Sequence, residues 1–214
     1  MKKAYICNCN HYNYKNKNFH YWENKSVTTD ERLIIKYLKK NFLFINKKIL
    51  HIGIGNSYLY DNYKSNNKIY GITISRNEIN KALSYKDKNY NVKYCDKLSK
   101  HFKMMFKKKK FDLIIDNNLK SYSCCEISFN YFFKNIVNLL SKNSIIITSR
   151  NGMKWFKKIK PKISFNFKNL IHYKIKEVKG NSDNLLSIKE VKYLSKKFSL
   201  DLFYNDKIYF FRKK

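Results

Sequence analysis

Two of the chain's five glycines stand two residues apart directly after a short apolar run, and this spacing suits a ligand-binding turn. The run Ile49–Ile52 continues as Gly53-Ile54-Gly55-Asn56-Ser57. Because glycine has no Cβ, a strand that ends in Gly-x-Gly lets the backbone come close to a bound molecule. A helix that begins there favours an anionic group at its N-terminus by about 0.3–1 kcal/mol. The structural alternative is a tight strand–helix turn with no ligand.

Polar side chains also stand where three later apolar runs end. Thr73 and Ile74 close the second run, Asp96 follows the third, and Asp116 and Asn117 follow the fourth. The carboxyl ends of parallel strands meet at one edge of a sheet, where ligands bind. We therefore expect a small molecule to lie over the glycine turn and between the ends of strands two and three.

The elements needed to hold these residues alternate along the chain. Apolar runs predict strands over residues 48–53, 69–74, 92–95, 111–116, 144–149, 200–204 and 208–211. Helical spacing is found over residues 28–42, 57–63, 75–83, 126–140 and 187–197. Strands that alternate with helices in this way indicate βαβ units and a parallel sheet covered on both faces.

The last two strands break the alternation. Only Asn205-Asp206-Lys207 joins them, and so short a connection permits only a hairpin. The predicted fold is therefore a doubly wound α/β fold. Its mostly parallel, seven-stranded sheet has a reversed C-terminal strand.

Several side chains are expected to face the core from the helices. Ile79, Ala82 and Leu83 share one side of the helix after the second strand. In the later helix, apolar residues at helical spacing are Ile127, Tyr131, Ile136, Leu139 and Leu140. Thr28 with Glu31, and Ser75 with Glu78, each form a capping box.

The length predicts one domain with an added arm. Residues 1–25 are rich in Asn, Tyr and Lys without a period, which predicts an N-terminal arm or lid. Residues 26–214 form the single domain. Within it, residues 150–186 are less regular and contain the chain's one proline, which predicts an insertion near the active face.

The net charge of +31 has two interpretations. Lys and Arg number 46 against 15 acidic residues, a balance typical of proteins that bind nucleic acid or another polyanion. However, Arg supplies only four of the 46, and Lys, Asn and Ile are the residues that A/T-rich codons encode. The positive charge therefore results either from selection for binding a polyanion or from the codon usage of an A/T-rich genome.

Cysteine usage and hydropathy indicate a cytoplasmic protein. No apolar run approaches the length of a membrane span, and Met1–Asn8 lacks the apolar stretch of a secretion signal. Five cysteines give an odd number without the spacing of a disulfide framework.

The cysteines also allow two kinds of chemistry. Cys7-Asn8-Cys9-Asn10-His11 resembles a set of metal ligands, but a zinc site needs four ligands and only His20 is near, so no metal is expected. Cys124-Cys125 offers a nucleophile, although the start of a buried helix explains it better.

Taken in order, these segments resemble the class I S-adenosylmethionine-dependent methyltransferases over about residues 28–213. The family's first motif is an apolar strand, an acid and Gly-x-Gly-x-Gly, which here is Leu50–Ser57. Tyr70–Ser75 stands where the family has Gly-x-Asp-x-Ser, and Tyr94-Cys95-Asp96 matches the third-strand motif. The resemblance implies S-adenosylmethionine as cofactor, bound by Gly53, Ile54, Gly55 and Ser57, by Thr73, Ile74 and Asp96, and by Asp116 and Asn117.

Three departures from the family pattern concern the cofactor. His51 replaces the acid that helps hold the methionine amino group. Ser57 replaces the third glycine, which a serine can do if its backbone conformation is an ordinary one. Thr73 replaces the acid that binds the ribose hydroxyls, and Glu78 is then the nearest carboxylate for that role. Glu78 can instead form a capping box with Ser75. The ribose-binding role and the capping role of Glu78 are compatible.

The expected function is methyl transfer from S-adenosylmethionine to an unidentified acceptor: a small molecule, a glycan, a lipid or RNA. No catalytic residue is named, because holding the acceptor in line with the methyl group is the main task. The first alternative is a non-catalytic protein that binds RNA or another polyanion and keeps the fold. The second is a nicotinamide-dependent oxidoreductase, which the missing final glycine and Thr73 disfavour.

Overall fold

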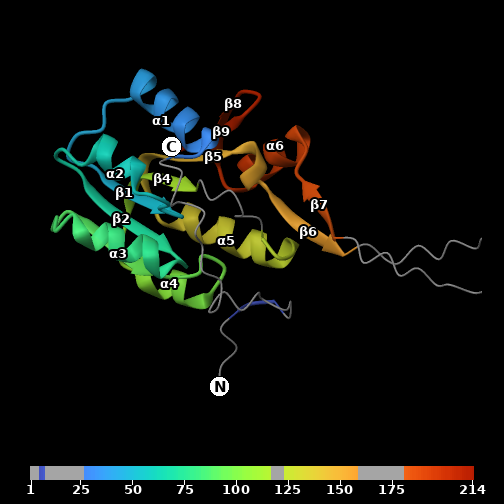
Figure 1. The fold of residues 1–214 in the computed structure, drawn as a ribbon. Helices are drawn as coiled ribbons and strands as arrows, with labels where there is room; N and C mark the ends of the chain where they lie inside the picture. Colours follow the sequence, from blue (N-terminus) through green and yellow to red (C-terminus); the bar gives the residue numbers. More distant parts are fainter. Residues whose placement is uncertain (1–4, 8–26, 117–122, 159–180) are drawn as a thin grey trace, which may run out of the picture.

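Helices cover both faces of a seven-stranded sheet in the computed structural model, which describes residues 5–7, 27–116, 123–158 and 181–214 (Figure 1). The strand order is β3-β2-β1-β4-β5-β9-β8. The strands are β1 (Lys48–Ile52), β2 (Lys68–Thr73), β3 (Tyr90–Tyr94), β4 (Phe111–Asp116), β5 (Leu140–Ser149), β8 (Leu200–Tyr204) and β9 (Ile208–Lys213). The helices are α1 (Thr29–Asn41), α2 (Tyr58–Tyr63), α3 (Arg76–Ser84), α4 (Lys100–Phe106), α5 (Glu126–Asn138) and α6 (Ile188–Lys197).

The predicted sheet is confirmed, including its reversed strand. Strands β1 to β5 pair in parallel, and β9 runs antiparallel between β5 and β8. Asn205 closes the tight connection before β9, because its side-chain oxygen accepts hydrogen bonds from the backbone N–H groups of Lys207 and Ile208, each at 2.9 Å. The parallel strands therefore present their carboxyl ends at one edge.

Two apolar cores lie on opposite faces of the sheet, because alternate residues of a strand point to opposite sides. In β1, Ile49 packs with residues of α1 and α2, whereas Leu50 packs with residues of α4 and α5. In β4, Leu113 and Ile114 divide in the same way. The β1 and β4 side chains are buried on both faces, as expected for central strands of a doubly wound sheet.

Two of the predicted core residues are wrong. Leu83 is 61% exposed and Ile127 is 60% exposed. In α3, Ala82 is the buried residue, and this short helix packs on β3 and β2 at one end of the sheet. In the segment of α5, the predicted Ile136, Leu139 and Leu140 are buried. The sequence interpretation missed Phe129, Phe132 and Phe133, which are buried as well.

The structure also contains elements that the sequence did not predict. Helix α4 lies between β3 and β4, and it buries Phe102 and Phe106 although lysines surround them in the sequence. A short turn of helix over Arg150–Gly152 follows β5. After it, β6 (Lys154–Lys158) and β7 (Asn181–Leu185) form a separate two-stranded sheet that leaves the main body (Figure 1).

The domain boundaries remain predictions. Of the expected arm over residues 1–25, the structure describes residues 5–7, and of the expected insertion, residues 159–180 lie outside the described part of the chain. None of the helices in the described ranges combines the length and apolar character that crossing a bilayer requires.

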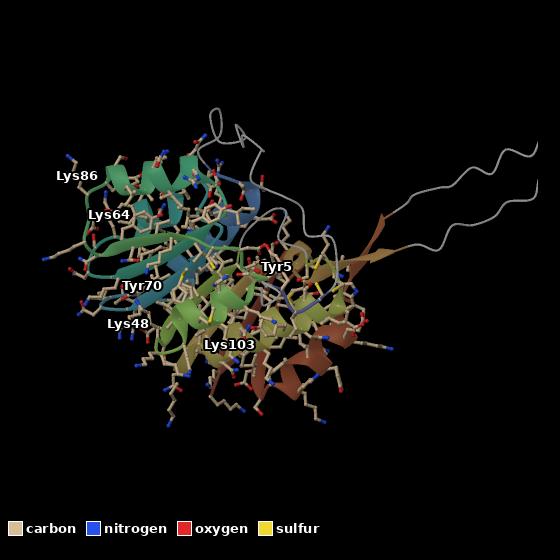
Figure 2. The ribbon with its side chains drawn as sticks, turned by 90° about the horizontal axis from the view of Figure 1, so that it is seen from below. Tyr5, Lys48, Lys64, Tyr70, Lys86 and Lys103 are labelled. Carbon is tan, nitrogen blue, oxygen red and sulfur yellow. The ribbon has the colours of Figure 1, made fainter. Side chains whose placement is uncertain are left out.

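Exposed lysines lie on many elements of the molecule. Figure 2 shows Lys48, Lys64, Lys86 and Lys103, which lie on β1, at the end of α2, after α3 and on α4. All four are exposed. Lys48, Lys64 and Lys86 lie on the same side of the molecule in this view.

Candidate functional site

The glycine turn after β1 has the backbone conformation that only glycine adopts readily. Gly53 and Gly55 have φ values of 78° and 51°. The N–H of Gly53 donates to the carbonyl of Ile72 at 2.8 Å, which ties the turn to the end of β2. A side chain at either glycine would be strained by about 1–2 kcal/mol. The turn therefore brings bare backbone to the carboxyl edge of the sheet.

Ser57 corrects an expectation, because its backbone conformation is not ordinary. It lies in the left-handed region with φ 65°, immediately before α2, and is fully buried. Its hydroxyl accepts a hydrogen bond from the Tyr90 hydroxyl at 2.9 Å. A serine therefore occupies a position whose φ favours glycine, and Tyr90 of β3 holds it there.

Close packing between β2 and the turn depends on Gly71. A Cβ built on Gly71 would lie 2.6 Å from Cγ2 of Ile54. That distance is shorter than real side chains allow, so a larger residue would displace Ile54. Gly71 thus permits the turn to lie against β2.

The end of β2 carries a small hydrogen-bonded cluster. The Thr73 hydroxyl donates to the carboxylate of Glu78 at 2.5 Å and accepts from the backbone N–H of Ser75 at 3.0 Å. The Ser75 hydroxyl accepts from the backbone N–H of Glu78 at 3.4 Å, so Ser75 caps α3. Only this half of the expected capping box forms, because the N–H of Ser75 donates to the Thr73 hydroxyl. The Thr73 hydroxyl and the cap together hold the Glu78 carboxylate at the end of the strand.

Asp96 follows β3 and is held from two sides. Its Oδ1 accepts from the backbone N–H of Leu98, and its Oδ2 accepts from the Tyr5 hydroxyl, each at 2.9 Å. Tyr5 also forms an isolated antiparallel bridge with Ser99. The N-terminal segment therefore touches the edge of the candidate site.

Asp116, at the end of β4, forms a buried ion pair. Lys97 donates to both of its carboxylate oxygens, at 3.0 and 2.8 Å, and Lys97 lies 4.6 Å from the ring centre of Phe132. Burial lowers the pKa of Lys97, and Asp116 partly offsets the effect. Since β1 and β2 separate β3 from β4, the pair spans the carboxyl edge. Asn117 lies outside the described residues.

His51 faces a buried carboxylate that the sequence interpretation used only as a helix cap. Its Nε2 lies 3.8 Å from Oε1 of Glu31 in α1, and the two side chains are 1% and 4% exposed. Burial lowers the pKa of His51 to about 3. Burial likewise raises the pKa of Glu31 to about 8, while the backbone of Leu59 lowers it and the charge of Glu78 raises it. At neutral pH both groups are therefore mainly uncharged.

The carboxyl edge thus gathers most of the predicted residues. The described ones are His51, Gly53, Ile54, Gly55, Ser57, Thr73, Ile74, Glu78, Asp96 and Asp116. Sequence reasoning missed Glu31, Lys97 and Tyr5 as parts of this edge, and it missed Tyr90, which stands at the amino end of β3 and bonds Ser57 through its hydroxyl. Glu31 carried a signal, because it is an acid at the start of a helix directly before the glycine strand. The other three carried none, since only the folded chain makes their contacts.

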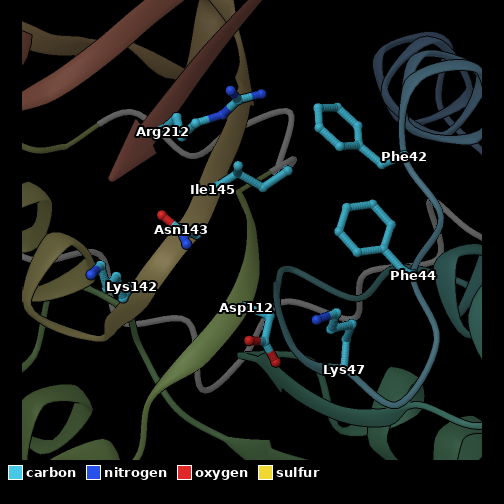
Figure 3. Close-up of a pocket in the computed structure, with 8 residues that line it drawn as sticks. All are labelled: Phe42, Phe44, Lys47, Asp112, Lys142, Asn143, Ile145 and Arg212. Carbon is cyan, nitrogen blue, oxygen red and sulfur yellow. The ribbon is translucent and has the colours of Figure 1, made fainter. Parts of the chain in front are cut away.

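A separate hollow lies at the opposite edge of the sheet. It has a volume of about 430 Å³, and Figure 3 shows Phe42 and Phe44 facing Ile145 and Arg212 across it. Lys47 and Asp112, which also line it, stand at the amino ends of β1 and β4. This hollow is therefore not part of the predicted site.

The arrangement can bind a molecule with both polar and cationic parts. The glycine turn offers close backbone approach, while Glu78 and Asp96 offer acceptors to hydroxyl and amino groups. Oε1 of Glu31 and both ring nitrogens of His51 are buried and have no hydrogen-bond partner within the described part of the chain. Such atoms favour a polar ligand group beside them.

A family model described as a methyltransferase domain matches residues 43–198, which is more than half of the chain. A comparison of the sequence with curated proteins finds no match.

Solved structures with the same fold are similar over most of the chain. The N-methyltransferase NodS from Bradyrhizobium japonicum WM9, in complex with S-adenosyl-l-homocysteine, has a TM-score of 0.56 at 12% identity and covers 87% of this chain and 88% of its own. Magnesium protoporphyrin IX methyltransferase (ChlM) from Synechocystis PCC 6803, with bound SAH, has a TM-score of 0.56 at 10% identity, with coverage of 86% and 81%. Against methyltransferase chains from Galdieria sulphuraria and Rickettsia typhi, this chain covers only 46% and 21% of their length.

Proposed function

Since this chain belongs to the methyltransferase-domain family and has the class I S-adenosylmethionine-dependent fold, we propose that it transfers a methyl group from S-adenosylmethionine to an acceptor. The observation that carries the proposal is the Gly53–Gly55 turn, flanked at neighbouring strand ends by the carboxylates of Glu78 and Asp96. Two similar methyltransferase structures hold S-adenosylhomocysteine, the demethylated product of that cofactor.

The residues at the edge fit the parts of this cofactor, whose sulfonium supplies an activated methyl group. The bare backbone of Gly53–Gly55 accommodates its methionine portion. Glu78 accepts hydrogen bonds from the two ribose hydroxyls, with the Thr73 hydroxyl holding its carboxylate in place. Asp96 accepts from the adenine amino group, and Ile74 contacts the ring.

Glu31 takes the role that the family gives to an acid at the position of His51. His51 is neutral and buried, so it offers no negative charge to the methionine amino group. The carboxyl group of Glu31 lies beside it, and one of its oxygens has no hydrogen-bond partner in the described ranges. A bound ammonium group would favour the ionised form of Glu31, because an opposite charge lowers the pKa of an acid.

Catalysis in this proposal rests on orientation. Methyl transfer needs the acceptor in line with the methyl group, and holding two reactants in that geometry contributes roughly 7–11 kcal/mol. The acceptor is a small molecule, a glycan, a lipid or RNA, and it binds beside the end of β4. The segment that follows, residues 117–122, lies outside the described residues.

Calorimetric titration tests the proposal. S-adenosylmethionine and S-adenosylhomocysteine should each bind at one equivalent, and NADH should not bind. Gly53→Val should abolish binding, because Gly53 has a φ of 78° and its N–H is bonded to β2. Absence of binding by all three compounds, in protein that unfolds cooperatively, would contradict the proposal and favour a non-catalytic protein.

A further inference from the structure

Three cysteine sulfurs from distant parts of the sequence meet at the start of α5. The Sγ atoms of Cys7, Cys124 and Cys125 all lie within 4.8 Å of one another. Cys7 and Cys124 are 3.4 Å apart, and Cys124 and Cys125 are 4.0 Å apart. The sequence shows two unrelated cysteine groups, and only the fold makes them one.

The spacing suits a single metal ion. A tetrahedral zinc ion with Zn–S bonds of about 2.3 Å holds its sulfurs about 3.8 Å apart. The observed separations lie within about 1 Å of that value, so small side-chain rotations bring all three sulfurs to one ion. A disulfide would use only two of the three sulfurs.

The surroundings hold the sulfurs in place beside the N-terminus of α5. Ser128, which is fully buried, lies 3.1 Å from the Cys124 sulfur and accepts from the Cys125 backbone N–H at 3.2 Å. Cys124 and Cys125 directly precede α5, whose N-terminus favours negative charge. Burial raises the pKa of the Cys124 thiol, and a coordinated metal supplies the positive charge that an ionised thiol needs there.

We propose that Cys7, Cys124 and Cys125 bind one Zn²⁺ ion. On binding, each thiol loses its proton to solvent, and the three thiolates leave one position of the tetrahedron for a fourth ligand. Zinc is favoured over harder divalent cations because all three protein ligands are soft sulfur atoms.

The ion would fasten the N-terminal segment to the body of the protein. Tyr5 already contacts Asp96 and bridges to Ser99. With Cys7 bound to the same ion as Cys124, residues 5–7 are held at both ends against the carboxyl edge. This role does not depend on the proposed methyl transfer, since it concerns the anchoring of a segment.

Spectroscopy of the full chain tests the site with Co²⁺ as a substitute for Zn²⁺. Reduced, chelator-treated protein should bind one equivalent of Co²⁺ with the near-ultraviolet charge-transfer absorption of three cobalt–thiolate bonds, and Zn²⁺ should remove that absorption. In the unaltered protein, Zn²⁺ should protect Cys7, Cys124 and Cys125 from alkylation, as counted by mass spectrometry. The second measurement needs no variant.

Variants assign the ligands. Cys7→Ser, Cys124→Ser and Cys125→Ser should each weaken Co²⁺ binding at least tenfold, whereas Cys95→Ser, a change to a buried cysteine outside the cluster, should leave the affinity unchanged. If a variant at the start of α5 fails to fold, Cys7→Ser and the alkylation experiment still decide. Three outcomes overturn the proposal. They are the absence of saturable Co²⁺ binding, the absence of protection of the three cysteines from alkylation by Zn²⁺, and a Cys7–Cys124 disulfide that persists in the presence of reductant.

Discussion

At the residue scale, the end of β2 shows what accompanies Thr73 where the family pattern has an acid. Thr73 is too short to accept from both ribose hydroxyls, but its hydroxyl donates to Glu78, which has a carboxylate. The backbone N–H of Glu78 takes part in the cap on α3, whereas its carboxylate is bonded to Thr73. The ribose role of that carboxylate is a proposal that mutagenesis tests.

Glu78→Ala should weaken S-adenosylhomocysteine binding at least tenfold, because each charge-assisted hydrogen bond contributes roughly 1.5–3 kcal/mol. Thr73→Asp should partly restore affinity in that background. Calorimetry on folded protein measures both. Glu190 is the control, because it is also the third residue of a helix whose serine N-cap accepts from its backbone N–H. Glu190→Ala should lower only the melting temperature, and an equal result for Glu78→Ala would contradict the ribose role.

The pair of Glu31 and His51 predicts opposite effects of pH on stability. The pKa of Glu31 is raised to about 8, so the unfolded state binds fewer protons than the folded state between about 4.5 and 8, and stability falls as pH rises there. The pKa of His51 is lowered to about 3, so stability falls as pH decreases from about 6.5 to 3. Above pH 6.5 the effect of Glu31 acts without that of His51.

Glu31→Gln should therefore remove part of the loss of stability between pH 6.5 and 8. Urea unfolding of the two proteins across that range gives the difference in free energy of unfolding, in which contributions from other groups cancel. A difference that does not change with pH would show that Glu31 ionises normally in the folded protein.

At the element scale, the connection from β1 to α2 depends on backbone conformation more than on side chains. Gly53, Gly55 and Ser57 all have positive φ within five residues. The first two are glycines, as a ligand-binding turn requires. Ser57 keeps a strained conformation, and the hydrogen bond from Tyr90 compensates for it.

Ser57→Ala should destabilise the protein by about 1–3 kcal/mol, because it leaves the buried Tyr90 hydroxyl without that acceptor. Ser57→Gly should be about 1 kcal/mol less harmful than Ser57→Ala, since glycine relieves the left-handed strain. Exposed Ser199, with φ 53°, is the control. The free energy of unfolding of Ser199→Gly should be higher than that of Ser199→Ala, by about the same 1 kcal/mol. If Ser57→Gly and Ser57→Ala are equally stable, the strain is absent.

At the scale of the whole molecule, the charge of +31 is the dominant property. Exposed lysines such as Lys48, Lys64, Lys86 and Lys103 lie on different elements (Figure 2). One further lysine, Lys97, is buried in the ion pair with Asp116. The two interpretations of the charge, codon bias and a selected polyanion partner, predict different binding to RNA.

Codon bias predicts that single-stranded RNA of random sequence binds weakly and without saturation, and that salt abolishes the binding. Each phosphate contact contributes about −0.7 to the slope of log affinity against log salt concentration. Filter binding over a salt series measures this slope. Tight, saturable binding at moderate salt would instead identify RNA as a partner.

Much of the fold was predictable because periodicity is local. The strand runs, the glycine turn and the three-residue connection before β9 each follow from neighbouring residues, and together they determine the parallel sheet with its reversed strand. Helix α4 was missed because its buried Phe102 and Phe106 stand among lysines. The buried face of α5 was predicted only in part: Ile136 is buried as expected, Ile127 is exposed, and the buried Phe129, Phe132 and Phe133 were missed because several apolar stripes fit the sequence.

The site divides in the same way. By itself the sequence determined that Gly53, Thr73 and Asp96 stand at strand ends and that Glu78 stands in the first turn of the helix after β2, because chain direction places those ends at one edge. Only the tertiary structure decided what meets them from elsewhere: Glu31 beside His51, Lys97 on Asp116, and Cys7 against Cys124 and Cys125. The physical reason is that these contacts join residues whose separation in sequence carries no period, so packing alone brings them together.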